Sequence, residues 1–204
     1  MSTKGSLTRQ KIIEKSMQLF SVKGYFNTSI DDITRAAGLT KGGLYGHFHN
    51  KEEIWYAGYD ECVRLWKSIV FKGVRGFPDP LERLERVIEN SLKNYLGADV
   101  FDGGCFLLNS LVELSGQEPA MSGHVLQGFR SFAELLHQWL TEAERQGLLK
   151  EGLNLREVAL FLVITMNGAS SMYAASKDPA VWQQTLAQLR AYLGHLRKVG
   201  SHRN

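Results

Sequence analysis

Apolar residues recur along most of this chain at intervals of three and four, which is the spacing of one face of an α-helix. No segment shows the regular alternation of apolar and polar residues that predicts a half-buried β-strand. The first helical stretch runs from about Thr8 to Lys23, and its apolar positions are Ile12, Ile13, Met17 and Phe20. The pattern therefore predicts an all-α protein of about nine helices.

Residues that favour helix ends mark the boundaries between these stretches. Thr28 and Ser29 each have an aspartate three residues on, and Asn50 has Glu53 at the same distance, which is the spacing of a capping box. Glycine and proline separate the later stretches in the same way. After the first helix, we therefore expect helices at about residues 30–37, 41–48, 51–71, 80–96, 105–114, 121–145, 155–176 and 179–198.

The composition agrees with one or two globular domains. The chain has 204 residues, of which 44% are hydrophobic and 22% charged, enough to bury a sizeable core. The longest apolar run, Val158–Met166, is shorter than the roughly 20 residues that span a bilayer, and no signal-peptide pattern precedes the first helix. Cys62 and Cys105 do not make a disulfide framework. These features predict a cytoplasmic protein with no membrane partner.

The basic charge gathers near the N-terminus. The whole chain has a formal net charge of +3, but residues 1–51 contain eight Lys and Arg against three acidic residues. That segment carries +5, which leaves −2 for the remainder. A basic end on a mildly acidic body favours contact with a polyanion such as nucleic acid. A solvated surface without a partner gives the same asymmetry, so both interpretations stay open on charge alone.

The segment Thr28–Glu53 contains two short helices joined by Ala-Gly-Leu-Thr, which is the layout of a helix-turn-helix. Gly38 supplies the left-handed backbone that such a turn requires. Gly42 and Gly43 each cost about 1 kcal/mol relative to alanine inside a helix, a cost that is tolerated where the backbone must approach another surface closely. Entry into the DNA major groove is one such case, and a frayed helix start is the other interpretation.

Several residues around these two helices suit contact with DNA. Hydroxyl groups at helix N-termini and basic or aromatic side chains beside a recognition helix suit phosphates and base edges. The candidate DNA-binding residues are therefore Thr28, Thr40, Lys41, Gly42, Gly43, Tyr45, His47 and Lys51.

The same segment, TSIDDITRAAGLTKGGLYGHFHNKEE, resembles the DNA-binding part of the tetracycline-repressor (TetR) family of transcriptional regulators. The resemblance covers about the first 55 residues, with roughly ten positions in register, whereas Gly46 stands where the family often has a larger residue. It implies that Lys41, Gly42 and Gly43 approach the major groove and that the other candidates contact phosphates. It also implies a helix-turn-helix domain at 1–53 and an effector-binding and dimerisation domain at 54–204, linked by the helix at about 51–71.

The last two predicted helices suit a helix–helix interface. In the last helix, apolar residues from Trp182 to Leu196 follow spacings of 4, 3, 4 and 3, and the helix before it has small residues that allow close packing. Packing within one chain is one interpretation. The resemblance implies instead a four-helix homodimer interface, which we predict to contain Phe161, Gly168, Met172, Trp182, Leu186, Leu189 and Leu193.

Aromatic and sulfur-containing side chains are frequent between the two ends of the chain. Ordinary core packing explains them, and the resemblance implies a pocket for a small apolar or aromatic effector. Cys105 stands at a predicted helix start, where a thiol is either an acidic, reactive sensor or simply buried. The pocket residues that we predict are Trp66, Tyr95, Cys105, Phe106, Phe129, Phe132, Trp139 and Met166.

The sequence predicts no catalytic residue, cofactor or metal site. His47 and His49 have no third ligand at a metal-binding distance, and no HExxH, P-loop or GxSxG pattern is present. We therefore expect a DNA-binding transcriptional regulator that is not an enzyme. It is expected to be a ligand-responsive homodimer that binds a palindromic operator and acts as a repressor rather than an activator. An all-α enzyme and a ligand-binding dimer that does not bind DNA are the alternatives.

Overall fold

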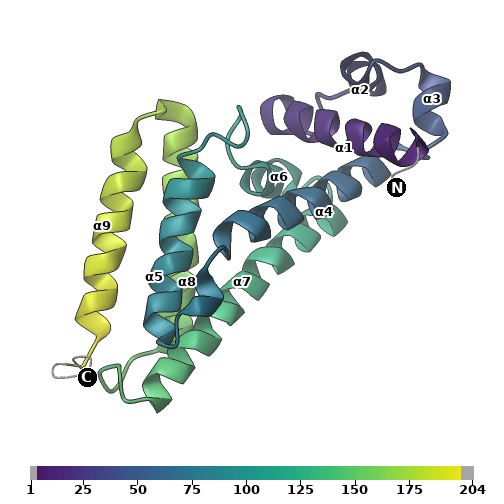
Figure 1. Ribbon diagram of the computed structural model, residues 1–204. Coiled ribbons are helices and arrows are strands. Elements are labelled where there is room, and N and C mark those ends of the chain that lie inside the picture. Colours follow the sequence, from purple (N-terminus) through teal and green to yellow (C-terminus); the bar gives the residue numbers. More distant parts are fainter. Residues whose placement is uncertain (1–3, 199–204) are drawn as a thin grey trace. The chain divides into compact units, whose positions relative to one another are not determined.

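The computed structural model describes residues 4–198, and the regular structure in that range is helical (Figure 1). No strand forms there, and Leu149 and Arg197 make an isolated antiparallel β-bridge. The all-α prediction of about nine helices is confirmed. The α-helices are α1 (Lys4–Lys23), α2 (Ile30–Ala37), α3 (Lys41–Tyr45), α4 (Lys51–Val70), α5 (Pro80–Glu89), α6 (Phe106–Leu114), α7 (Pro119–Arg145), α8 (Leu155–Ser176) and α9 (Pro179–Leu196), with a 3₁₀ turn η1 (Val74–Gly76) and a π-helix η2 (Asn90–Leu96).

Two elements end earlier than the apolar pattern predicts. The helix expected at 41–48 ends at Tyr45, because the next residue is glycine and the chain tightens into a turn in which His47 N–H donates to the Leu44 carbonyl at 2.9 Å. The helix expected at 80–96 is α-helical only to Glu89 and continues as the π-helix η2. At this change the buried Asn90 side chain donates to carbonyl groups outside the helix.

The described chain divides into two compact units. The N-terminal unit comprises the residues up to Trp66 together with Val100–Gly123, and the C-terminal unit comprises Lys67–Asp99 and the residues from His124 onward. Helix α6 therefore belongs with α1, α2 and α3. This is a grouping by packing, and the functional boundary expected at residue 53 remains a prediction.

The core of the N-terminal unit forms where α1 packs on α2 and α6 and where α2 packs on α3. Its apolar stripe on α1 is buried as the spacing predicts. The Phe106 ring, fully buried, lies 6.5 Å from Phe20, 6.3 Å from Trp55 and 6.3 Å from Phe101, measured between ring centroids. The prediction that Phe106 lines an effector pocket is therefore wrong, because its whole surface is used to pack this core.

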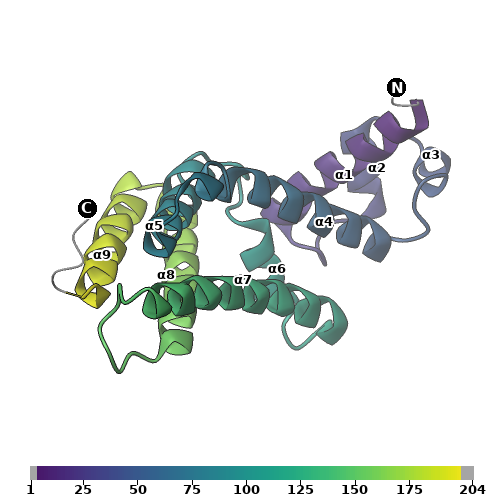
Figure 2. The same ribbon diagram turned by 60° about the horizontal axis from the view of Figure 1, so that its bottom comes forward.

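In the C-terminal unit, α9 packs against α5, η2 and α8, and α8 and α9 lie side by side (Figures 1 and 2). The apolar seam of α9 faces this packing, with Leu186, Leu189 and Leu193 exposed by only 6%, 2% and 0%. Trp182, at the start of the seam, packs against Gly97 at the end of η2. The prediction that Leu186, Leu189 and Leu193 form a dimer interface is wrong, because they fill the core of their own chain. Trp182 is only half-buried, so its place in an interface remains a prediction.

This packing makes α9 a stability element. We expect Leu193→Ala to lower the free energy of unfolding by about 2–5 kcal/mol, because it leaves a cavity in a closed core. Leu126→Ala is the matched control, since Leu126 is 37% exposed and the same truncation there loses little buried surface. Denaturant unfolding measures both variants. Equal stability of the two would contradict the core assignment of α9.

Helix α8 has apolar residues on two sides. Its inner side is buried in the unit, whereas Leu160, Phe161, Ile164 and Met172 are 51%, 45%, 60% and 66% exposed. Gly168 lies on the same exposed side. The helix continues to Ser176, past the run considered in the sequence, and so passes a length and hydropathy test for a membrane span, which the core helices of soluble proteins also pass.

Candidate nucleic-acid interface

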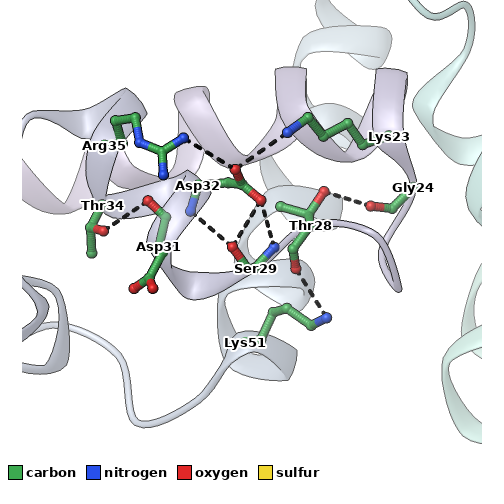
Figure 3. Close-up of polar contacts among 9 residues, drawn as sticks. All are labelled: Lys23, Gly24, Thr28, Ser29, Asp31, Asp32, Thr34, Arg35 and Lys51. Carbon is green, nitrogen blue, oxygen red and sulfur yellow. Dashed lines mark hydrogen bonds and ion pairs between the residues drawn. The ribbon is translucent and has the colours of Figure 1, made fainter.

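The start of α2 is fixed by a reciprocal cap (Figure 3). Ser29 Oγ accepts a hydrogen bond from Asp32 N–H at 3.0 Å, and the Asp32 carboxylate accepts one from Ser29 N–H at 3.1 Å. Lys23 Nζ lies 3.3 Å from the same carboxylate. The hydrogen bonds from Ser29, joined by that of Lys23, lower the pKa of Asp32 from 3.8 to about 2. Of the two caps that the sequence allowed, Ser29 is the one used.

The Asp32 carboxylate should therefore report on this cap. Because its pKa is lower in the folded chain than in the unfolded chain, its contribution to stability is complete above 3.8 and is lost as the pH falls towards about 2. We expect an NMR titration of the Asp32 carboxyl carbon to have its midpoint near pH 2, and Ser29→Ala to move that midpoint towards 3.8. A wild-type midpoint already at 3.8 would contradict the cap.

The turn between α2 and α3 is equally well defined. Gly38 ends α2 with a left-handed backbone, φ 67°, and its N–H donates to the Arg35 carbonyl. Thr40 begins α3, and its Oγ1 accepts a hydrogen bond from Gly43 N–H at 3.1 Å. Leu44 is fully buried and fixes α3 to the core of the N-terminal unit. The short helix is thus held by one side, and its opposite side is presented to solvent.

The exposed side of α3 consists of Lys41, Gly42, Gly43 and Tyr45. A Cβ atom built on either glycine would meet Thr40 Oγ1 at 4.0 or 3.4 Å, an ordinary contact, so packing within the chain leaves room for a side chain. Each glycine nevertheless costs about 1 kcal/mol of helix stability. The two glycines therefore suit the close approach of a surface that is not part of this chain.

Lys41, on this side, already has a charged neighbour. Its Nζ lies 2.8 Å from a carboxylate oxygen of Asp31 on α2, and both side chains are more than half exposed. The hydrogen bond and charge of Asp31 raise the pKa of Lys41. An exposed pair of this kind contributes little to folding. Lys41 can therefore exchange Asp31 for another anion at low cost.

Two predicted phosphate contacts have structural roles. Thr28 is fully buried, and its hydroxyl donates to the Gly24 carbonyl at 2.6 Å (Figure 3). The prediction that this hydroxyl contacts a phosphate is therefore wrong. Lys51 Nζ, half-buried at the start of α4, donates to the carbonyls of Tyr25 and Thr28 at 2.8 and 3.1 Å. Desolvation lowers the pKa of Lys51. His47, after α3, is partly buried.

The residues predicted to form an effector pocket are divided between the two units. Trp66 and Cys105 belong to the N-terminal unit, and Cys105 precedes the first residue of α6 without capping it through its side chain. In the C-terminal unit, Phe132 and Trp139 pack on Phe71 at 6.4 Å between ring centroids. The other members of that unit are Tyr95, Phe129 and Met166. A pocket built from these residues remains a prediction.

Two hollows of the C-terminal unit are lined by other residues. One, of about 730 Å³, lies between the end of α4 and the end of α5 with the start of η2, and another, of about 380 Å³, lies along α7. Within residues 4–198, no group of three or more His, Cys, Asp or Glu side chains is placed to hold a metal ion.

Two family models match this chain. One, described as the bacterial regulatory proteins of the tetR family, matches residues 12–56, which include α2, α3 and the turn between them. The other, described as the tetracyclin repressor-like C-terminal domain, matches residues 80–189, more than half of the chain. The chain belongs to the TetR family. The resemblance inferred from Thr28–Glu53 is thereby confirmed.

Individual TetR-family proteins are similar to this one along most of their length. The transcriptional repressor DhaR of Mycobacterium sp. strain GP1 is 29% identical over 79% of each chain, and the negative regulator IcaR of Staphylococcus epidermidis is 26% identical over 65% of this chain and 66% of its own. A regulator from Chloroflexus aurantiacus has a TM-score of 0.88 with 24% identity, covering 95% of this chain and 98% of its own. One from Cytophaga hutchinsonii has a TM-score of 0.83 with 27% identity, covering 96% and 97%.

Membership of the TetR family confirms that this protein is a DNA-binding transcriptional regulator. Proteins of the family bind operator DNA, function as dimers and typically respond to ligands, and they are generally not enzymes. The family model for the DNA-binding domain spans the whole exposed side of α3. Sequence reasoning missed two residues of this region, Asp31 as the partner of Lys41 and Glu113 of α6, and only the folded chain brings each to its partner.

Proposed function

We propose that this protein is a homodimeric repressor that binds a palindromic operator through the exposed side of α3 and releases it when a small effector binds. The observation that carries the proposal is the surface formed by Lys41, Gly42, Gly43 and Tyr45. A rigid, capped helix-turn-helix presents it, and the two glycines leave space for close approach. Gly42 and Gly43 face the major groove, while Lys41 and Tyr45 contact bases or the adjoining phosphates.

The exposed apolar side of α8 supports the dimer. Phe161, Ile164, Gly168 and Met172 follow one another at three- and four-residue spacings on this side. The Phe161 ring contacts Tyr192 of α9 at 5.0 Å, so the surface extends onto the neighbouring helix. Contiguous apolar surface of this kind is rare on monomers unless another molecule covers it. A second copy covers it here through a two-fold contact between helices.

Two copies of α3 on such a dimer fit an inverted repeat. Half-sites about 34–36 Å apart, or a multiple of that distance, are contacted from one face of the duplex. Repression rather than activation is supported by DhaR and IcaR, which are described as a repressor and a negative regulator. Operator binding by this protein takes place in the cytoplasm.

The effector is a small apolar or aromatic molecule bound in the C-terminal unit. Its aromatic side chains, among them Tyr95, Phe129, Phe132 and Trp139, support this chemistry. The effector releases the operator only if it binds more tightly to the state that does not bind DNA. Operator DNA must then weaken effector binding by the same factor.

Selection of genomic fragments by the purified protein tests the proposal. We expect enrichment of fragments that share an inverted repeat, with an affinity that falls steeply as salt increases, because several phosphates are neutralised in each half-site. Enrichment without a shared repeat would contradict operator recognition. Binding that does not change with salt would contradict the role proposed for the basic residues of the first 51 positions.

A further inference from the structure

The turn between α1 and α2 is held by a residue far away in the sequence. Glu113, in the last turn of α6, accepts hydrogen bonds from the main-chain N–H groups of Tyr25 and Phe26 at 2.7 and 3.0 Å. Both carboxylate oxygens are used, one for each donor. Hydrogen bonds to an ionised acceptor are stronger than those between neutral groups. One side chain of α6 thus binds the first two residues after Gly24.

Gly24 is shaped for this contact. Its φ is +82°, and a Cβ atom there would collide with the Glu113 carboxylate. The turn therefore needs a glycine for two reasons, the left-handed backbone and the approach of Glu113. The colliding group is the end of a side chain, so a methyl group at this position would displace the carboxylate from its donors rather than unfold the turn.

Lys51 binds the carbonyl groups of the same turn. Its ammonium donates to Tyr25 and Thr28, and it lies 4.2 Å from the centroid of the Tyr25 ring. Figure 3 shows the bond to Thr28 and the Thr28 hydroxyl directed at Gly24. A carboxylate thus binds the N–H groups of the turn and an ammonium binds its carbonyl groups. The segment Gly24–Thr28, from which α2 begins, is fixed by both.

A second contact attaches α6 to the end of α1. Asn109 Nδ2 donates to the Ser21 carbonyl at 3.1 Å and to the Gly103 carbonyl at 2.8 Å. A Cβ atom on Gly103 would collide with the Ser21 carbonyl, so the loop before α6 also lies directly on α1. Helix α6 therefore meets the last turn of α1 at one point and the following turn at another.

We infer that Glu113 is a positioning residue for operator recognition, because it and Lys51 fix the Gly24–Thr28 turn and thereby the direction in which α2 and α3 leave α1. The inference rests on the proposed operator binding. Glu113 is not itself a contact for DNA. Its removal should leave α3 folded and basic but let it adopt a range of orientations. Binding to a specific operator should then suffer, whereas binding to unrelated DNA, which needs only charge, should not.

Glu113→Ala and Glu113→Gln test this inference. We expect operator affinity to fall by about 10-fold or more in the alanine variant and by less in the glutamine variant, whose single amide oxygen can still accept one N–H bond. Affinity for unrelated DNA at low salt should not fall. Hydrogen exchange of the Tyr25 and Phe26 amides should be at least about 10-fold faster in Glu113→Ala, since these bonds are lost.

Glu118→Gln is the control for charge. It removes one negative charge from the same unit, so its effect on binding to a polyanion should be neutral or favourable. Glu113→Gln should therefore weaken operator binding although it makes the protein more basic. A general electrostatic effect would give both variants the same sign.

Gly24→Ala and Gly116→Ala provide a second, independent pair. Both glycines have nearly the same left-handed backbone, φ +82° and +81°, but nothing lies within 4 Å of the Cβ position at Gly116. The backbone strain is thus matched, and only Gly24→Ala displaces Glu113. We expect operator affinity to fall in Gly24→Ala alone.

The outcomes separate this inference from the proposed function. A wild-type protein that binds no operator would overturn the proposed function and the inference with it. A wild-type protein that binds its operator, together with unchanged affinity in Glu113→Ala and in Gly24→Ala, would overturn the inference alone. Equal loss of affinity for operator and unrelated DNA would also overturn it, because that result indicates general damage to the domain. If Glu113→Ala does not fold, Glu113→Gln and the glycine pair give the same decision.

Discussion

Replacement of Ile164 by aspartate is expected to convert the protein into a monomer and to abolish operator binding. Ile164 is 60% exposed at the middle of the apolar side of α8, so the substitution should leave the fold of one chain intact. In the dimer, however, a carboxylate at this position would be buried without a partner, at a cost of several kcal/mol. Because the two α3 helices bind adjacent half-sites together, loss of the dimer removes their combined affinity. Sedimentation and a DNA mobility-shift assay measure the two effects.

Leu126→Asp is the control for this variant. Leu126 is an exposed apolar residue of the same unit but lies on α7, so the same substitution should leave the dimer intact. A wild-type protein that sediments as a folded monomer would contradict the α8 interface. So would an Ile164→Asp variant that still forms dimers while its fold is unchanged.

Alanine substitution of Lys41 or Tyr45 is expected to weaken operator binding by about 10-fold to 100-fold, because each removes a contact made in or beside the major groove. Thermal unfolding should hardly change, since both side chains are on the exposed side of α3. Tyr45→Phe separates the two parts of the tyrosine. If the hydroxyl makes the contact, the phenylalanine variant should lose as much affinity as the alanine variant. Titration of labelled operator at fixed salt measures each affinity.

Two charge variants serve as comparisons for Lys41. Lys67→Ala removes the same charge from an exposed position of α4 in the C-terminal unit, and its effect should be small. Asp31→Asn should have the opposite sign and strengthen binding, because it releases Lys41 from its ion pair and removes a negative charge beside the DNA. Wild-type affinity in Lys41→Ala would contradict the role of α3 as recognition helix.

The helix-turn-helix was predictable because its determinants are local. Capping residues, the left-handed Gly38 and the paired glycines of α3 lie within a few residues of the structure that they specify. Local rules did not decide which of Thr28 and Ser29 caps α2, since both have an aspartate at the right spacing. The fold decides it, because Thr28 is buried against Gly24 while Ser29 faces Asp32.

Which side of each later helix is buried in its own chain and which is exposed was not predictable from the sequence of that helix. The 4-3-4-3 seam of α9 predicts a partner helix but does not state whether that helix belongs to the same chain. In the structure the leucines of the α9 seam are buried in the chain's own core, and the exposed apolar side belongs to α8. The same limit explains why the location of Phe106 was predicted wrongly, since an aromatic ring suits a pocket and a core equally well. It also explains why the role of Glu113 was missed, since its hydrogen-bond donors are 88 and 87 residues away in the sequence.

The dependence of affinity on half-site spacing tests most directly that two α3 helices of one dimer read the operator together. In the selected operator, an insertion of about five base pairs between the half-sites turns one of them to the opposite face of the duplex, and about ten base pairs bring it back. We predict that the shorter insertion reduces the affinity to that of a single half-site. The longer insertion should reduce the affinity by a smaller factor. A single half-site bound as tightly as the intact operator, or equal affinity at every spacing, would contradict this account.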